Sequence, residues 1–280
     1  MSCVESRIDI SSSQNVVVEN SEVKPGDDCV VVYALHPNEM VTRNITIRNT
    51  TVSDKLQPPP FSLSHALFAV QCHTPFSIGN GDYGTHEYME DVPFENCTVR
   101  GGLTPNDLRF KPVSPAATFC AVLRSLKEAA VAQRWWQSAL RVKGNPGANV
   151  TVRNVVFRDI EVVDVDLVFD LAMHYACQNT SGTDNYNDCA GAQHGSPAIL
   201  PSVSGIHFEN IRGTAWRSGW FRCLPEAPCR DVTFNGIDVV ASEPFVCEHA
   251  EVSGWEPAEQ ACAPTRPGGE AAAVQPKVSV

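Results

Sequence analysis

The sequence lacks several features that mark large classes of proteins. No apolar run approaches the length that crosses a membrane as a helix, so no membrane-spanning segment is predicted. Basic residues are outnumbered, with 21 Lys and Arg against 32 Asp and Glu, and the formal net charge is −11. Nucleic acid is therefore not an expected partner, because its recognition needs a basic face. CxxC pairs are also missing, so we expect no zinc site, no other metal and no cofactor.

The cysteines that are present point to an exported protein. Eleven of them in 280 residues are many for a cytosolic chain, and the odd number leaves at least one thiol unpaired. Close spacing predicts small disulfide loops for three pairs, namely Cys177/Cys189, Cys223/Cys229 and Cys247/Cys262. N-glycosylation triplets begin at Asn44, Asn49, Asn96, Asn149 and Asn179. The first six residues do not resemble a signal peptide, so either the protein stays inside the cell or its true N-terminus lies upstream.

A short β-type pattern recurs along the chain. Its copies alternate apolar and polar residues, and most of them end in Asn and lead into a second short strand; they are Asn15–Asn20, Asn44–Asn49, Val92–Asn96, Asn149–Asn154, Gly205–Asn210 and Asp231–Asn235. Asn tolerates a left-handed backbone at a corner, and stacked Asn side chains can bond from one coil to the next. The pattern therefore predicts strands that turn at Asn corners.

The spacing of the copies favours an all-β, right-handed parallel β-helix over a β-sandwich. From Asn15 to Asn44 is 29 residues and from Gly205 to Asp231 is 26, which suits one helical turn of strands and corners. A sandwich gives hairpin signals at roughly 8–12 residues, and Asn-Gly hairpins are nearly absent here. We expect the β-helix to span residues 1–255 as a monomer, followed by a disordered tail over 256–280 that is rich in Ala, Pro and Gly.

One interval breaks the period. From Val92 to Asn149 is 57 residues, and the stretch from 116 to 136 has the composition of an amphipathic helix. Removal of about 105–137 would restore an ordinary coil. Two interpretations stay open, a helical insertion in a loop and a segment foreign to the fold, such as translated non-coding sequence.

Four short motifs carry the chemistry, in a fixed order. They are Gly26-Asp27-Asp28-Cys29, then Cys72-His73-Thr74 with Ser77-Ile78-Gly79, then Arg141-Val142-Lys143, then Tyr175. Paired carboxylates at a strand start suit acid/base hydrolysis of a glycosidic bond, although Asp-Asp alone is more often a solvated turn or a weak cation site. Arg141 and Lys143 alternate along a strand and so share one face, which on pattern alone is a solvated one.

In this order the motifs resemble those of glycoside hydrolase family 28, the polygalacturonases, which carry GDDC, GHG with SIGS, and RIK on a right-handed parallel β-helix. The resemblance runs from about residue 8 to about residue 262. It implies a secreted hydrolase that acts on α-1,4-linked galacturonan in pectin, with a polysaccharide as its partner. Inversion across a gap of about 6.5–9.5 Å between carboxyl groups is the expected mechanism.

The resemblance also implies a role for each matching residue. Asp27 matches the acid that protonates the leaving oxygen, Asp28 a carboxylate that orients the attacking water, and His73 the histidine beside the acid. Arg141 and Lys143 match the basic pair that binds the galacturonate carboxylate. Tyr175 matches a tyrosine that contacts the sugar.

Two departures from the family pattern bear on activity. Ser6 stands where the family has the Asp of an Asn-Thr-Asp-Gly motif, which supplies another water-activating carboxylate. Thr74 replaces a Gly after His73, which adds a side chain where substrate approaches. Coils upstream of the first strand are expected to be missing as well. The sequence thus leaves three functions open: a hydrolase with impaired activity, an inactive pectin-binding β-helix, and a calcium-dependent lyase on the same fold.

Overall fold

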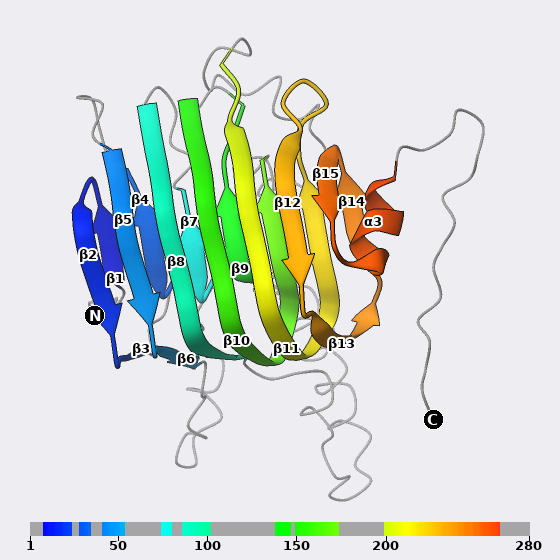
Figure 1. Ribbon diagram of the computed structural model, residues 1–280, viewed down its shortest axis with the longest axis horizontal. Coiled ribbons are helices and arrows are strands. Elements are labelled where there is room, and N and C mark those ends of the chain that lie inside the picture. The colour runs from blue at the N-terminus through cyan, green and yellow to red at the C-terminus, as the bar shows by residue number, and fades with distance from the viewer. Residues whose placement is uncertain are drawn as a thin grey trace, which may run out of the picture.

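The computed structural model describes residues 8–23, 28–34, 41–53, 74–79, 86–101, 138–146, 149–173 and 199–263. Figure 1 shows their strands side by side along one long axis, from β1 and β2 at one end to β15 and α3 at the other. The elements are β1 (Ile8–Ser11), β2 (Gln14–Glu19), β3 (Glu22–Val23), β4 (Val30–Tyr33), β5 (Val41–Arg48), β6 (Thr51–Ser53), β7 (Phe76–Ile78), β8 (His86–Arg100), β9 (Ser138–Lys143), β10 (Asn149–Ala172), β11 (Ser202–Arg222), β12 (Cys229–Asn235), β13 (Asp238–Glu243), β14 (Val246–Glu248), β15 (Ala250–Ser253) and α3 (Glu256–Cys262).

The strands of each coil pair in parallel with those of the next coil, and this stacking gives the β-helix three faces. The site face contains β1, β4, β7, β9, the ends of β10 and β11, and β14. The ladder face contains β2, β5, the first parts of β8, β10 and β11, then β12 and β15. A short third face contains β3, β6, the end of β8, the middles of β10 and β11, and β13. The predicted parallel β-helix is confirmed.

The coils differ in length more than the sequence pattern predicted. Hydrogen-bonded partners on successive coils of the ladder face lie 29, 47, 63, 51 and 26 residues apart. The expectation of a period near 26–29 with a single interruption was therefore wrong for two further coils. Strand register survives because extra residues between strands lengthen connections without moving the strands. The predicted insertion at 105–137 lies outside the described residues.

Asn occupies most of the corners, as predicted, and Asp occupies others. The corner between the ladder face and the short face holds five of them with φ between 49° and 54°, namely Asn20, Asn49, Asn96, Asp159 and Asn210. These short polar side chains accept the left-handed backbone that a sharp bend requires. Their amides also bond between coils, with Asn49 donating to Asn20 at 3.3 Å, Asn96 to Asn49 at 2.7 Å and Asn210 to Asp159 at 2.9 Å. The predicted ladder of Asn side chains is confirmed.

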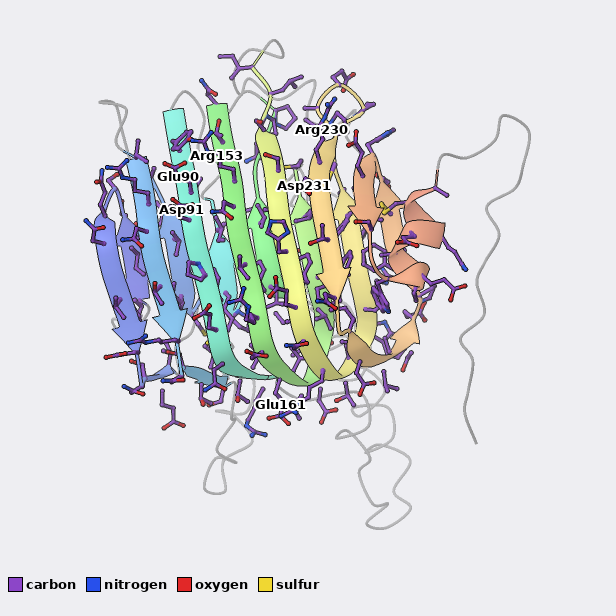
Figure 2. The ribbon with its side chains drawn as sticks, viewed as in Figure 1. Glu90, Asp91, Arg153, Glu161, Arg230 and Asp231 are labelled. Carbon is purple, nitrogen blue, oxygen red and sulfur yellow. A yellow bond between two sulfur atoms is a disulfide. The ribbon has the colours of Figure 1, made fainter. Side chains whose placement is uncertain are left out.

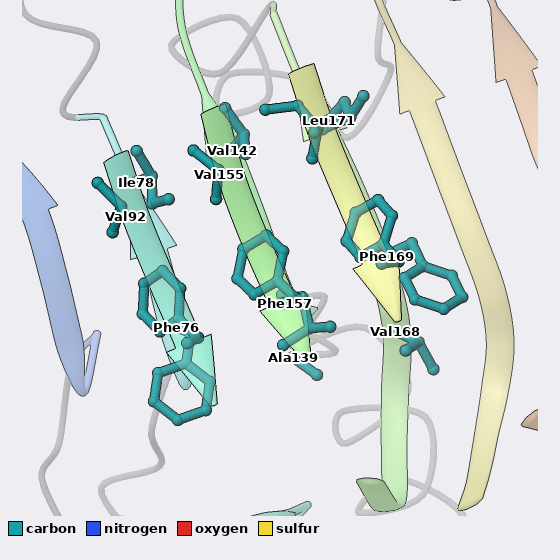
Figure 3. Close-up of a cluster of buried hydrophobic side chains, with 14 of the residues drawn as sticks. Phe76, Ile78, Val92, Ala139, Val142, Val155, Phe157, Val168, Phe169 and Leu171 are labelled. Carbon is teal, nitrogen blue, oxygen red and sulfur yellow. The ribbon is translucent and has the colours of Figure 1, made fainter. Parts of the chain in front are cut away.

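Within a largely aliphatic interior, aromatic rings stack from coil to coil in the same direction as the strands. Phe94, Phe157, Phe208 and Phe234 occupy one position in successive coils, and the centroids of neighbouring rings lie 4.9, 5.3 and 5.1 Å apart. Figure 3 shows Phe157 in this core together with Phe169, whose ring meets Phe208 edge-on. Offset and edge-on contacts of this kind add about 0.5–1.5 kcal/mol per pair to the burial of apolar area.

The C-terminal end of the β-helix is closed by α3. Trp255 precedes the helix, and its ring packs against Phe169, Phe234 and Phe245 at centroid distances of 5.5–5.8 Å. A disulfide joins Cys247 to Cys262 and ties the helix to β14. The prediction of a disordered tail from residue 256 was therefore wrong at its beginning, because aromatic packing and a disulfide order 256–262. Residues 264–280 lie outside the described residues.

The remaining cysteine predictions have mixed outcomes. The Cys223–Cys229 disulfide is confirmed, and the proposed Cys177/Cys189 pair lies outside the described residues. In the described part of the chain Cys97 is a free, buried thiol, and burial raises its pKa to about 11. The described residues contain no helix that is both long and apolar enough to cross a lipid bilayer.

Charges of opposite sign face one another along the ladder face. Arg158 lies between Glu95 and Glu209 on the neighbouring coils, at 2.9 and 2.6 Å. Figure 2 shows Glu90 on β8 beside Arg153 on β10, and their side chains approach to 2.7 Å. Exposed pairs of this kind contribute about 0.2–1 kcal/mol each, so they reinforce the register rather than dominate stability.

Candidate active site

The site face aligns the polar side chains that the sequence singled out with others that it did not. The register places Ser77, Arg141, Asp170 and Trp220 in one row across β7, β9, β10 and β11. Along β9, Leu140 and Val142 belong to the hydrophobic core, so the alternating Arg141 and Lys143 lie on the opposite side of the strand.

Arg141 is held by three side chains from three strands or strand starts. Its Nε donates to Asp170 Oδ2 at 2.7 Å, one terminal nitrogen donates to Thr74 Oγ1 at 2.9 Å, and the other donates to Ser138 Oγ at 2.7 Å. Ser138 in turn donates to the same Asp170 oxygen at 2.6 Å. Arg141 is only 2% exposed, and these hydrogen bonds fix the plane and the position of its guanidinium. The solvated strand face that Arg-x-Lys suggests on pattern alone is not what forms.

Lys143 joins the basic pair to the first of the motifs. Its Nζ donates to Asp28 Oδ2 at 2.8 Å, although the two residues are 115 positions apart in the chain. Both side chains are buried, at 7% and 5% exposure. The parallel coils thus bring Asp28, Arg141 and Lys143 together from two motifs that are far apart in the chain.

Asp170 connects this pair to a third cation. Its Oδ1 accepts a hydrogen bond from Arg222 at 2.9 Å, while its Oδ2 accepts hydrogen bonds from Arg141 and Ser138. Asp170 is fully buried and Arg222 is 5% exposed. We call Asp28, Arg141, Lys143, Asp170 and Arg222 the ion-pair cluster. Its three cations face two carboxylates, so the cluster carries an excess positive charge inside a chain whose net charge is −11.

The carboxylates of the cluster stay ionised. Burial by itself raises the pKa of Asp28, but the charge of Lys143, its hydrogen bond and the charge of Arg141 outweigh burial and lower that pKa below its usual value. For Asp170, burial is again outweighed, here by the charges of Arg222 and Arg141 and by the Ser138 hydroxyl, so its pKa is also lowered. An ionised Asp28 can accept a proton or orient water, but it cannot act as an acid.

Asp27, His73 and Tyr175 lie outside the described residues, as does Ser6. No group of three or more His, Cys, Asp or Glu side chains among the described residues is placed to hold a metal ion.

Asp170 and Arg222 belong to the cluster but were missed in the sequence. Asp170 follows Arg141 by 29 residues, the same interval that separates Asn15 from Asn44. That coincidence with the coil period is the signal that could have placed it beside Arg141. Arg222 follows Asp170 by 52 residues, across one of the longer coils, so no constant period points to it.

Comparisons with known proteins agree with the motifs. No protein-family model matches the chain. An exopolygalacturonase of Rhizopus delemar is 23% identical over 83% of this chain and 47% of its own length. A putative galacturan 1,4-alpha-galacturonidase A of Aspergillus flavus is 25% identical over 89% of this chain and 50% of its own length.

A solved structure, the exopolygalacturonase of Thermotoga maritima, aligns with 89% of this chain and 44% of its own, with a TM-score of 0.45 and 14% identity. The chain spans about half the length of the curated relatives it matches. The resemblance that the ordered motifs indicated is confirmed at the level of sequence, because the chain is similar to these proteins over more than four fifths of its length.

Proposed function

We propose that this chain is a glycoside hydrolase that cleaves α-1,4-linked galacturonan by inversion, with the site face as its substrate-binding surface. The observation that carries the proposal is the ion-pair cluster, where Arg141 and Lys143 lie side by side with Asp28 and positive charge is in excess. Galacturonate carries one carboxylate per sugar, and that carboxylate is the group the cluster complements. Charge-assisted hydrogen bonds from Arg and Lys to a carboxylate are stronger than neutral ones, so this pair of cations suits that group.

Asp28 has the properties of the residue that orients the attacking water. Lys143 keeps it ionised and fixes one of its oxygens at 2.8 Å. The acid of an inverting pair must instead stay protonated, and we assign that role to Asp27 from the resemblance. The names of the relatives, which include exopolygalacturonases, favour release of galacturonate from chain ends.

Ser6 limits the rate in this proposal. With Ser at the position of the second water-activating Asp, Asp28 acts alone, so we expect slow turnover. Restoration of a carboxylate by Ser6→Asp is expected to raise the rate, since a second carboxylate shares the activation of water.

The test is reducing-sugar release from polygalacturonate at a substrate concentration well above KM. Asp28→Asn keeps the size of the side chain and removes its charge, and we expect a loss of at least 100-fold, the lower end of what acid/base groups contribute. Asp9→Asn is the matched control, because Asp9 is exposed on β1 of the same face. Equal rates for the wild type and Asp28→Asn would refute the assignment of Asp28.

An inactive pectin-binding protein is the second candidate, and Ser6 is the feature that favours it. Isothermal titration with trigalacturonate separates the two. Binding without any release of sugar, in the wild type and in Ser6→Asp alike, would establish the second candidate in place of the first. The impaired hydrolase predicts release that Ser6→Asp accelerates.

A further inference from the structure

Toward the α3 end, the ion-pair cluster borders the ring of Trp220, which is contacted by Arg222 of the cluster and by Arg217, a residue outside it. Trp220 lies in the row of Arg141 and Asp170, one strand beyond Asp170. Strands in a sheet are about 4.8 Å apart, so Trp220 lies about 10 Å from Arg141 along the row, a distance that a disaccharide spans.

The arginines are stacked on the indole of Trp220. The guanidinium carbon of Arg222 lies 4.3 Å from the ring centroid, and that of Arg217 lies 5.2 Å from it. A guanidinium that stacks on an aromatic face keeps its N–H edge directed outward in the plane, where it matches a carboxylate with two hydrogen bonds. Trp220 and Arg217 are half-buried, whereas Arg222 is buried and bonded to Asp170.

These observations give each of these residues a separate role. Asp170 holds Arg222, and both arginines lie over Trp220. Of the two cations, the half-buried Arg217 is the one that is more open to solvent. The next strands mark the end of this positive stretch, because the half-buried Glu243 on β13 aligns with Arg217 and the exposed Glu248 on β14 aligns with Arg222.

We propose that Arg217 binds the carboxylate of a second galacturonate, about two sugars from the one at Arg141 and Lys143, and that Trp220 positions its guanidinium. A methyl ester on that second sugar would remove the charge that Arg217 binds. This inference rests on the proposed function of the site face.

Isothermal titration with trigalacturonate and with monomeric galacturonate tests it. A charge-assisted hydrogen bond contributes about 1.5–3 kcal/mol, so Arg217→Gln should weaken trigalacturonate binding about 10-fold to 150-fold and leave binding of the monomer unchanged. A fully methyl-esterified trimer should bind Arg217→Gln and the wild type equally. Trp220→Leu should weaken trigalacturonate binding in the same direction, and Trp220→Phe, which keeps an aromatic face, should recover part of the loss.

The ladder face supplies a matched control. Arg153 stacks on Tyr88 at 4.8 Å, away from the site face, so Arg153→Gln should leave both affinities unchanged. Trigalacturonate binding that survives Arg217→Gln, or an equal loss for trimer and monomer, would overturn this inference and spare the proposed function. Failure of the wild type to bind either ligand would overturn both.

Discussion

Asp170→Asn is the substitution that tests the ion-pair cluster most severely. Asp170 is fully buried, and its two oxygens accept hydrogen bonds from Arg141, Arg222 and Ser138. An Asn of the same shape has one oxygen to accept with, and it turns an amide N–H₂ toward a guanidinium. Two buried cations then lose their counter-charge, and removal of one partner of a buried ion pair costs about 3–5 kcal/mol. We expect a loss of that size in the free energy of unfolding.

Urea denaturation followed by circular dichroism at pH 7 measures this loss. Glu161→Gln, a half-buried carboxylate on the same strand, is the control and should change stability by no more than about 0.5 kcal/mol. The pKa of Asp170 is lowered in the folded state, so its contribution is present above the unfolded pKa near 3.9 and is lost as pH falls through the folded pKa. The gap between wild type and Asp170→Asn should therefore narrow in acid. A loss below about 1 kcal/mol at pH 7, or a gap that does not change down to pH 2, would refute the reasoning.

Three further outcomes follow from the core and the cysteines. Phe157→Ala removes one ring from the stack between Phe94 and Phe208 and should cost about 3–5 kcal/mol in urea denaturation; a cost near 1 kcal/mol would show a loose core. Cys97 should resist iodoacetamide at pH 8 until the protein unfolds, because burial raises its pKa to about 11, and peptide mapping that finds it alkylated in the native state would contradict this. Cys262→Ser opens a loop of 15 residues and should cost about 3 kcal/mol; an unchanged melting temperature would show that α3 does not need the disulfide.

Most of the β-helix could be predicted because its periodicity is local. Alternation over five or six residues and an Asn at the corner are visible in Asn44–Asn49 or Asn149–Asn154 without any knowledge of partners. Coil length could not be predicted in the same way, since residues in the connections leave no periodic trace. The helix at 256–262 was missed although Pro257, at its first turn, is a common start signal. Seven residues cannot form a stable helix alone, and its order comes from Trp255 and the disulfide.

The residues of the candidate site also fall into two groups, those that local sequence patterns identify and those that they do not. Asp28, Arg141 and Lys143 were identified by their motifs and their order, and the structure brings them together. Asp170 and Arg222 were not identified, because the function of an Asp or an Arg in a strand depends on the side chain beside it on the next coil, which no local pattern reveals. Sequence alone also suggested a solvated strand face for Arg141 and Lys143. Their burial depends on acceptors that come from other coils, such as Asp170 from β10.

The proposed activity is hydrolysis of galacturonan with inversion at the site face. Proton NMR of the sugar released during the first minutes of reaction with polygalacturonate tests both parts of it. Water that attacks the far side of an α-linkage yields the β-anomer first. We expect β-galacturonate to build up slowly with the wild type and not with Asp28→Asn. Early appearance of the α-anomer would contradict inversion, and no sugar from either the wild type or Ser6→Asp would contradict hydrolysis.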